Sequence, residues 1–195
     1  KRTEGDPGNQ PKEIVEIVRH IEAIAKEEGK KALPLWLPVI PPVVTVNDLE
    51  AKYSYSGDGE LNPVIGELDD PFNQSQRLLT LPFTQKGHAI CYGAAGSGKE
   101  SFAASVLYSL YQHHDSRELN TYILDFGSET LGVFEEAPQT RGIVVAGEEE
   151  KAANLFHFLN REIRRRKKLL ASVGGDYRTY RKRGGEDVPN ILVVI

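Results

Sequence analysis

With 195 residues, of which 39% are hydrophobic, the chain has the length and composition of one globular domain of ordinary size. The formal net charge of −4 at pH 7 argues against binding to nucleic acid through overall charge, and the single cysteine excludes a fold held together by disulfides. No apolar stretch approaches the roughly 18 residues that a membrane-spanning helix requires.

The N-terminal 50 residues are predicted to form a linker, one helix and an extended strap. Residues 1–11 are polar and rich in glycine and proline, as linkers are. Residues 32–46 contain four prolines, which fix φ and remove backbone donors, so we expect an extended strap anchored by Trp36. In residues 12–28, apolar side chains recur every three or four positions, which predicts an amphipathic helix that packs through this face. The face consists of Ile14, Ile17, Val18, Ile21, Ile24 and Ala25.

Residues 51–195 are predicted to form the second unit, preceded by a capped helical turn at residues 47–50. Residues 62–83 have the pattern of short strands, with turns at residues 69–71 and near Gly87. Asp69 and Asp70 would suit a metal pair. Aspartates before a proline are more often turn residues, and we interpret them in that way.

The most informative stretch is residues 88–110, where a short apolar run, a glycine-rich loop and an amphipathic helix follow one another. Residues 88–92 are predicted to be a strand that buries Cys91, and the helix is predicted over residues 99–113. This context is that of a phosphate-binding loop, G-x-x-x-x-G-K-[ST], whose backbone N–H groups and lysine surround an anion. The candidate nucleotide-binding residues are Gly93, Ala94, Ala95, Gly96, Ser97, Gly98, Lys99, Glu100 and Ser101.

Glu100 stands where the motif requires a hydroxyl group to ligate Mg²⁺. A carboxylate is longer and negatively charged, so it displaces the metal and repels the phosphates. It also suits the first turn of a helix and can pair with Lys99 as a built-in substitute for phosphate. Ser101 points about 100° away around the helix and cannot take over. We therefore expect ATP and Mg²⁺ to bind weakly. The alternative is a turn whose glycines only allow close packing.

Further strands are predicted at residues 121–126, 142–146 and 190–195, and a long helix at residues 148–171. Strands that alternate with helices predict an α/β fold with a mostly parallel central sheet flanked by helices. Ligands of such sheets bind beyond the carboxyl ends of the strands, where the glycine-rich loop and Asp125 would both lie. Asp125 is therefore a possible residue at the edge of the site.

The long helix opens with three glutamates and becomes basic over residues 161–168. This distribution matches the helix dipole, and we interpret it in that way. The alternative is a basic surface for contact between subunits, with an arginine that reaches the phosphates of a neighbour.

The order of these features resembles one RecA-like P-loop module of the FtsK/SpoIIIE-type ATPases, and most of all the motor of type VII (ESX, or WXG100) secretion. The strap and the following VNDL are similar to the segment that leads into each module of that motor. VIGELDDPFNQ resembles an (I/V)G-x-x-D-x-P-x-x-Q element, with Gly66, Asp69, Pro71 and Gln74 in step. PNILVVI resembles the strand that delivers the Walker B acid, which would follow Ile195. Asp125-Phe126-Gly127 stands where DNA translocases tend to have Asp-Pro-Lys, which favours the secretion branch.

This resemblance implies the cytoplasmic part of a membrane-anchored bacterial protein that contains several sibling ATPase modules and assembles as a homo-hexamer. Its substrates would be WXG100-type proteins recognised through a C-terminal signal, and DNA would not be a partner. Because the chain has no methionine and stops inside an apolar run, we expect it to be a piece of a longer polypeptide with a degenerate nucleotide site. The alternatives are an active DNA translocase module and a non-enzymatic module that binds the substrate signal.

Overall fold

The computed structural model describes residues 13–31, 37–57, 59–184 and 188–195. Contacts divide the chain into two compact units, residues 1–39 with 71–75 and residues 40–70 with 76–195. Helix α1 (Glu13–Glu27) lies in the first unit. The elements from α2 onward lie in the second unit, apart from the segment 71–75.

Helix α1 confirms the predicted amphipathic helix, and its polar side carries two ion pairs within the helix, Arg19–Glu16 at 2.9 Å and Lys26–Glu22 at 2.8 Å. Its apolar side is exposed, with Ile14 61% accessible. The packing that we expected for this face is therefore not found among the described residues. The linker at residues 1–11 and the strap residue Trp36 lie outside the part of the chain that the structure describes.

The strap residues 37–45 form neither helix nor strand, as predicted. Helix α2 (Val46–Tyr53) follows, and its first turn is capped by Thr45, whose hydroxyl oxygen accepts a hydrogen bond from the Asp48 N–H at 3.2 Å. Strands β1 (Val64–Asp70) and β2 (Ser75–Thr80) form a two-stranded sheet, and the short helix α3 (Phe83–Lys86) comes next. Asp69 lies in β1, where its Oδ1 accepts a hydrogen bond from Gln76 Nε2 at 3.3 Å.

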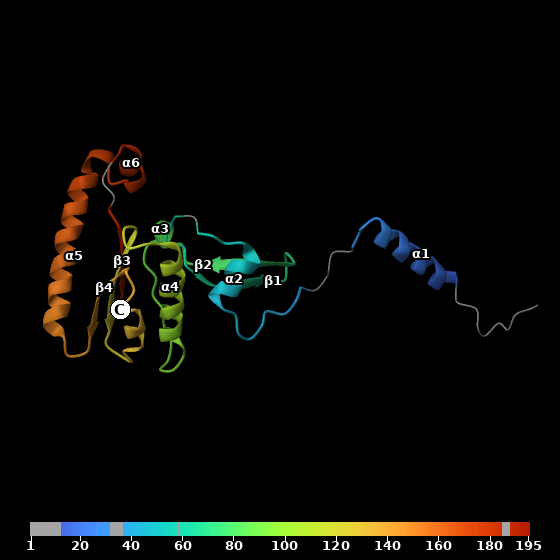
Figure 1. Ribbon diagram of the computed structural model, residues 1–195, viewed down its shortest axis with the longest axis horizontal. Coiled ribbons are helices and arrows are strands. Elements are labelled where there is room, and N and C mark those ends of the chain that lie inside the picture. Colours follow the sequence, from blue (N-terminus) through green and yellow to red (C-terminus); the bar gives the residue numbers. More distant parts are fainter. Residues whose placement is uncertain (1–12, 32–36, 58, 185–187) are drawn as a thin grey trace, which may run out of the picture. The chain divides into compact units, whose positions relative to one another are not determined.

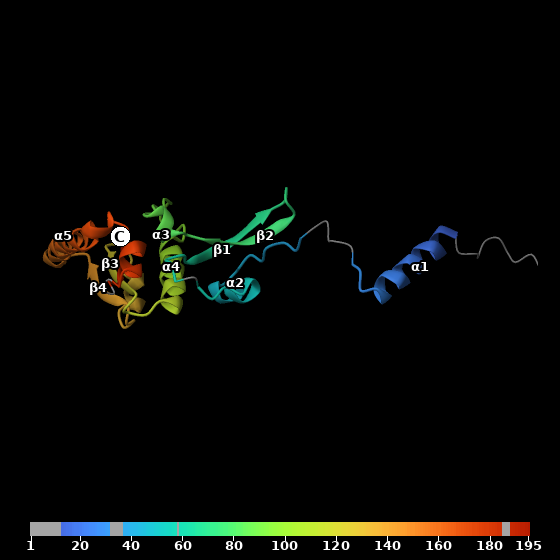
Figure 2. The same cartoon turned by 90° about the horizontal axis from the view of Figure 1, so that it is seen from above.

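The central sheet confirms the predicted parallel α/β architecture. It consists of β3 (Leu119–Asp125), β4 (Thr140–Val145) and β5 (Asn190–Val194), in the order β4-β3-β5 with both pairs parallel. Helices α4 (Lys99–His113) and α5 (Glu149–Leu170) lie on opposite sides of this sheet (Figures 1 and 2).

Successive residues of β3 explain why both helices are needed. Because side chains alternate along a strand, Ile123 packs with Leu107 of α4, whereas Leu124 packs with Leu155 of α5. A strand that is apolar on both faces is typical of a parallel sheet covered on both sides. The remaining elements are the short 3₁₀ helices η1 (Thr130–Phe134) and η2 (Ala171–Val173) and helix α6 (Tyr177–Lys182).

The strand predicted at residues 88–92 is wrong. These residues form no strand, Ile90 and Tyr92 are 77% and 88% exposed, and the Cys91 thiol is exposed rather than buried. A strand needs a neighbouring strand to satisfy its backbone, and residues 88–92 pair with none of the strands of the described sheet, whose order is β4-β3-β5. An apolar run of five residues shows only that a strand is compatible with the sequence, not that the run pairs with another strand.

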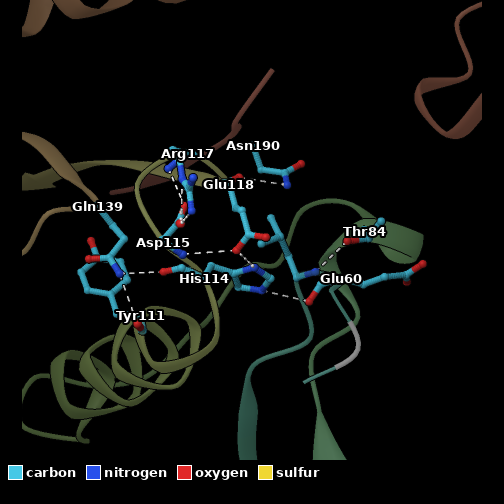
Figure 3. A network of polar contacts seen from close by, with 10 residues as sticks. Glu60, Thr84, Tyr111, His114, Asp115, Arg117, Glu118, Gln139 and Asn190 are labelled. Carbon is cyan, nitrogen blue, oxygen red and sulfur yellow. Dashed lines mark hydrogen bonds and ion pairs between the residues drawn. The ribbon is translucent and has the colours of Figure 1, made fainter. Parts of the chain in front are cut away.

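A polar network joins the end of α4 to the residue before β4, and the residue before β3 to the start of β5 (Figure 3). The buried Gln139 donates hydrogen bonds through Nε2 to the carbonyl oxygens of Tyr111 (3.1 Å) and His114 (2.7 Å). The Asn190 N–H donates to the carbonyl oxygen of Glu118 at 2.7 Å. These contacts satisfy backbone groups where the chain leaves the helix and enters the sheet.

Candidate functional site

The glycine-rich loop precedes α4 and turns through two glycines in the left-handed region. Gly96 has φ +72° and Gly98 has φ +88°, values that a residue with a side chain rarely adopts. The Ser97 N–H donates to the carbonyl oxygen of Ala94 at 3.2 Å, and the helix begins as the Phe102 N–H bonds to the carbonyl oxygen of Gly98 at 2.9 Å. The loop therefore places a helix N-terminus, which no side chain of the described residues caps, beside a tight turn, as anion-binding loops do.

Gly93 is required by the close approach of Ser97. A Cβ at position 93 would lie 2.3 Å from Ser97 Oγ and 3.3 Å from Ser97 Cβ. The same Cβ would lie 3.5 Å from Cγ of Lys99, which is ordinary van der Waals contact. Only glycine lets the two ends of the loop come this close without displacing the serine.

Lys99 folds back onto the loop that precedes it. Its ammonium group donates hydrogen bonds to the carbonyl oxygens of Gly93 at 2.9 Å and Ala94 at 2.8 Å. This arrangement differs from the predicted pair between Lys99 and Glu100, because the carbonyl groups occupy the ammonium instead. An anion that draws the ammonium group away from the loop would have to replace these two hydrogen bonds.

Glu100 and Ser101 lie in the first turn of α4, as the sequence predicts. Glu100 is half-buried and forms no ion pair with any residue that the structure describes. Ser101 is exposed, and its carbonyl oxygen accepts a hydrogen bond from Ser105 Oγ at 2.9 Å. The first turn of α4 thus carries a free carboxylate at the position next to the loop lysine.

Asp125 ends β3 and is 9% exposed. Its Oδ1 accepts a hydrogen bond from the Gly127 N–H at 3.3 Å, and its Oδ2 accepts one from the Leu131 N–H at 3.1 Å. Both bonds hold the loop that follows β3, and neither goes to the glycine-rich loop. Asp125 therefore organises its own loop, and among the described residues no cluster of histidine, cysteine or carboxylate side chains has a geometry that could hold a metal ion.

No sequence pattern predicts the residues that hold the C-terminal end of α4. Glu50 of α2 is 8% exposed, and its Oε1 lies 2.9 Å from His113 Nε2 and 3.5 Å from Ser109 Oγ. Ser109 Oγ in turn accepts a hydrogen bond from the Val64 N–H of β1 at 2.9 Å. Asn47 Oδ1 accepts hydrogen bonds from Tyr108 and Gln112 of α4. The helix that starts at the glycine-rich loop is thus anchored at its other end by α2 and β1.

The sequence matches a known family model and several known proteins. The family model described as the FtsK/SpoIIIE family matches residues 61–194. The chain is 30% identical over 196 residues to the type VII secretion system protein EssC of Staphylococcus aureus (strain NCTC 8325 / PS 47), a match that covers 94% of this chain and 13% of EssC. It is 28% identical over 185 residues to the ESX secretion system protein EccC of Geobacillus thermodenitrificans (strain NG80-2), covering 94% of this chain and 12% of EccC.

A solved structure shares the fold. The cytoplasmic domain of the Thermomonospora curvata type VII secretion ATPase EccC superposes with a TM-score of 0.68 at 22% identity, covering 81% of this chain and 21% of that one. The chain thus spans only a small fraction of the length of the proteins that it matches. None of the helices in the described residues is long and apolar enough to cross a membrane.

Proposed function

Because the chain belongs to the FtsK/SpoIIIE family, we propose that it is a degenerate nucleotide-binding module of a type VII secretion motor. The observation that carries this proposal is the first turn of α4, where Lys99 ends a loop with the sequence pattern of phosphate-binding loops and is followed directly by Glu100 instead of a residue with a hydroxyl group. The module would bind nucleotide weakly and contribute to the motor through its fold and its contacts.

The assignment to secretion rests on the relatives, EssC and EccC, which are type VII secretion proteins. In this proposal, residues 51–195 form one module among sibling ATPase modules of a longer, membrane-anchored chain, and the module lies on the cytoplasmic side. The assembled motor would be a homo-hexamer that exports WXG100-type substrates, and DNA would not be its cargo.

The electrostatic argument for weak binding starts from the charge of Glu100. Two like charges about 4 Å apart repel by roughly 1 kcal/mol in water and about 4 kcal/mol near a protein surface. An ATP triphosphate brings several negative charges to the loop, and Lys99 must first leave two carbonyl groups. Since about 1.4 kcal/mol corresponds to a factor of ten in affinity, a loss of one decade or more is expected.

Titration calorimetry with Mg-ATP tests this proposal on the wild type, Glu100→Thr and the control Glu150→Thr, which removes an exposed carboxylate from the first turn of α5. We expect weak or undetectable binding by the wild type and the control, and an affinity at least about tenfold higher for Glu100→Thr. If the wild type binds Mg-ATP with low-micromolar affinity and Glu100→Thr does not bind more tightly, the site binds nucleotide with Glu100 in place and the proposal is wrong.

A further inference from the structure

The second half of α5 carries cations that the fold itself does not use. Glu162 forms ion pairs with Arg165 and Arg166, each at 2.8 Å. Four further cations are exposed and form no ion pair with the described residues; they are Arg161, Arg164, Lys167 and Lys168. The helix dipole acts within the last turn of a helix, which here includes only Lys167 and Lys168. It does not account for Arg161 and Arg164.

Two exposed apolar side chains lie on the neighbouring stripe of α5. Phe156 and Ile163 are 46% and 51% exposed and lie seven residues apart, and therefore on the same stripe of the helix. Lys167 lies on this same stripe. The other three cations, Arg161, Arg164 and Lys168, lie on the adjacent stripe of the helix. We call this surface the basic face, consisting of Phe156, Arg161, Ile163, Arg164, Lys167 and Lys168.

A surface of opposite charge follows β3. In the segment 126–136, which we call the acidic loop, Glu129, Glu135 and Glu136 are exposed, and so are the apolar side chains of Phe126 and Val133. The loop has a defined conformation, because both carboxylate oxygens of Asp125 accept backbone hydrogen bonds from it and Leu131 is buried in the core. Such a preorganised surface loses little conformational entropy on binding.

The acidic loop and the basic face lie at opposite ends of α5. Strands β3 and β4 are parallel, so the acidic loop and the start of α5 are at the same edge of the sheet. There, Glu129 and Glu135 line a cavity together with Glu148 and Lys151 at the beginning of α5. Arg161 and Lys168 come 12 and 19 residues after Glu149, which at 1.5 Å per residue is about 18 Å and 28 Å further along the axis. The two surfaces cannot meet within one chain.

We propose that the acidic loop of one copy of this chain binds the basic face of a second copy. Three carboxylates would face four unpaired cations, while Phe126 and Val133 pack near Phe156 and Ile163. Because two different surfaces meet, the contact is head-to-tail, and successive contacts produce a closed ring or an open filament. This inference rests on the proposed assembly of copies, but not on nucleotide binding at Lys99.

Charge reversal with the full chain tests the pairing. Sedimentation velocity at about 0.5 mM protein, the range of effective concentration that tethering produces, is measured at about 50 mM and about 500 mM salt. We expect the wild type to assemble at low salt and to dissociate at high salt. Arg164→Glu/Lys168→Glu and Glu129→Lys/Glu135→Lys should each weaken assembly at least about tenfold. A mixture of the two variants should assemble again, because the reversed surfaces are complementary.

The control is Arg77→Glu/Lys86→Glu, which reverses two exposed cations outside the basic face and should leave assembly unchanged. If the wild type assembles and the variants assemble equally well, the pairing of the acidic loop with the basic face is wrong, whereas the proposed assembly of copies remains supported. A wild type that stays monomeric at low salt contradicts both the proposed assembly and the proposed pairing of surfaces. If the basic face variants assemble normally but lose binding to duplex DNA or to anionic vesicles, the face serves another polyanion and the proposal fails.

Discussion

The ammonium group of Lys99 lies 2.9 Å from the carbonyl oxygen of Gly93, across the loop that both residues define. A second bond to Ala94 at 2.8 Å completes the arrangement, so the lysine neutralises carbonyl dipoles of its own loop. Hydrogen bonds to a charged group contribute about 1.5–3 kcal/mol each. An anion that draws Lys99 out of the loop must replace both of them, and its affinity therefore depends on how easily Gly93 and Ala94 release the ammonium group.

The first prediction concerns the contact between Gly93 and Ser97. In Gly93→Ala, the new Cβ would lie 2.3 Å from Ser97 Oγ, so the serine must move and the loop changes shape. Displacements of this kind cost about 1–3 kcal/mol. In a Glu100→Thr background, we expect Gly93→Ala to weaken Mg-ATP binding in titration calorimetry about tenfold. Adding Ser97→Ala removes the clashing oxygen and should restore most of the affinity; a double variant as weak as Gly93→Ala would contradict this account.

The second prediction concerns the buried Glu50, which links α2 to α4 through His113 and Ser109. Glu50→Ala leaves buried polar groups without a partner, which costs about 1–3 kcal/mol each. We expect the free energy of unfolding in urea to fall by about 3 kcal/mol for Glu50→Ala and by about 1 kcal/mol for Glu50→Gln, which keeps the hydrogen bonds. Glu150→Ala, at an exposed position of α5, is the control and should change little. Equal effects of Glu50→Ala and Glu150→Ala would show that the anchor does not stabilise the fold.

The long helices and the central strands follow from local pattern, and the sequence predicts them well. In helix α4, apolar residues recur with the helical period of about 3.6, and strand β5 is an almost continuous apolar run. Both patterns are properties of the segment itself. The failure at residues 88–92 has a different origin, because a strand depends on the edge that another strand offers. Which segments pair is decided by the tertiary fold, and no local pattern encodes it.

In the candidate site, too, some features follow from local sequence and others depend on the folded chain. The loop, Lys99 and the first turn of α4 were predicted from the motif, and the resemblance to FtsK/SpoIIIE-type modules is confirmed by the family model. The bonds of Lys99 to its own loop and the anchor at Glu50 were not predictable. Glu50 and His113 are 63 residues apart, and a side-chain contact over such a separation appears only when the chain has folded.

The third prediction tests the contact between α4 and the sheet. Leu107 is fully buried among Ile123, Leu131 and Ile143. Truncation of such a leucine removes its transfer free energy and leaves a cavity, which together cost about 2–5 kcal/mol. We expect Leu107→Ala to lower the free energy of unfolding in urea by that amount, with an unchanged m-value. Phe72→Ala removes a larger side chain that is fully exposed, and it should cost less than about 0.5 kcal/mol.

The fourth prediction follows from Glu162 on α5. Hydrogen bonds from Arg165, and then from Arg166, lower the pKa of this carboxyl group to about 2. A group whose pKa is depressed by folding stabilises the protein above its unfolded pKa, and that contribution is lost as the pH falls through the folded pKa. Because Arg165 is half exposed and solvent screens the pair, we expect Glu162→Gln to cost only about 1 kcal/mol at pH 7.

The measurement is urea unfolding of the wild type and Glu162→Gln between pH 7 and pH 2. The difference in the free energy of unfolding should stay constant above the unfolded pKa of about 4.3 and should shrink as the pH falls toward about 2. Glu16→Gln on α1 is the control, since its partner Arg19 and its own side chain are both largely exposed. A difference for Glu162→Gln that is independent of pH would mean that the glutamate acts through packing and not through the charge that Arg165 and Arg166 stabilise.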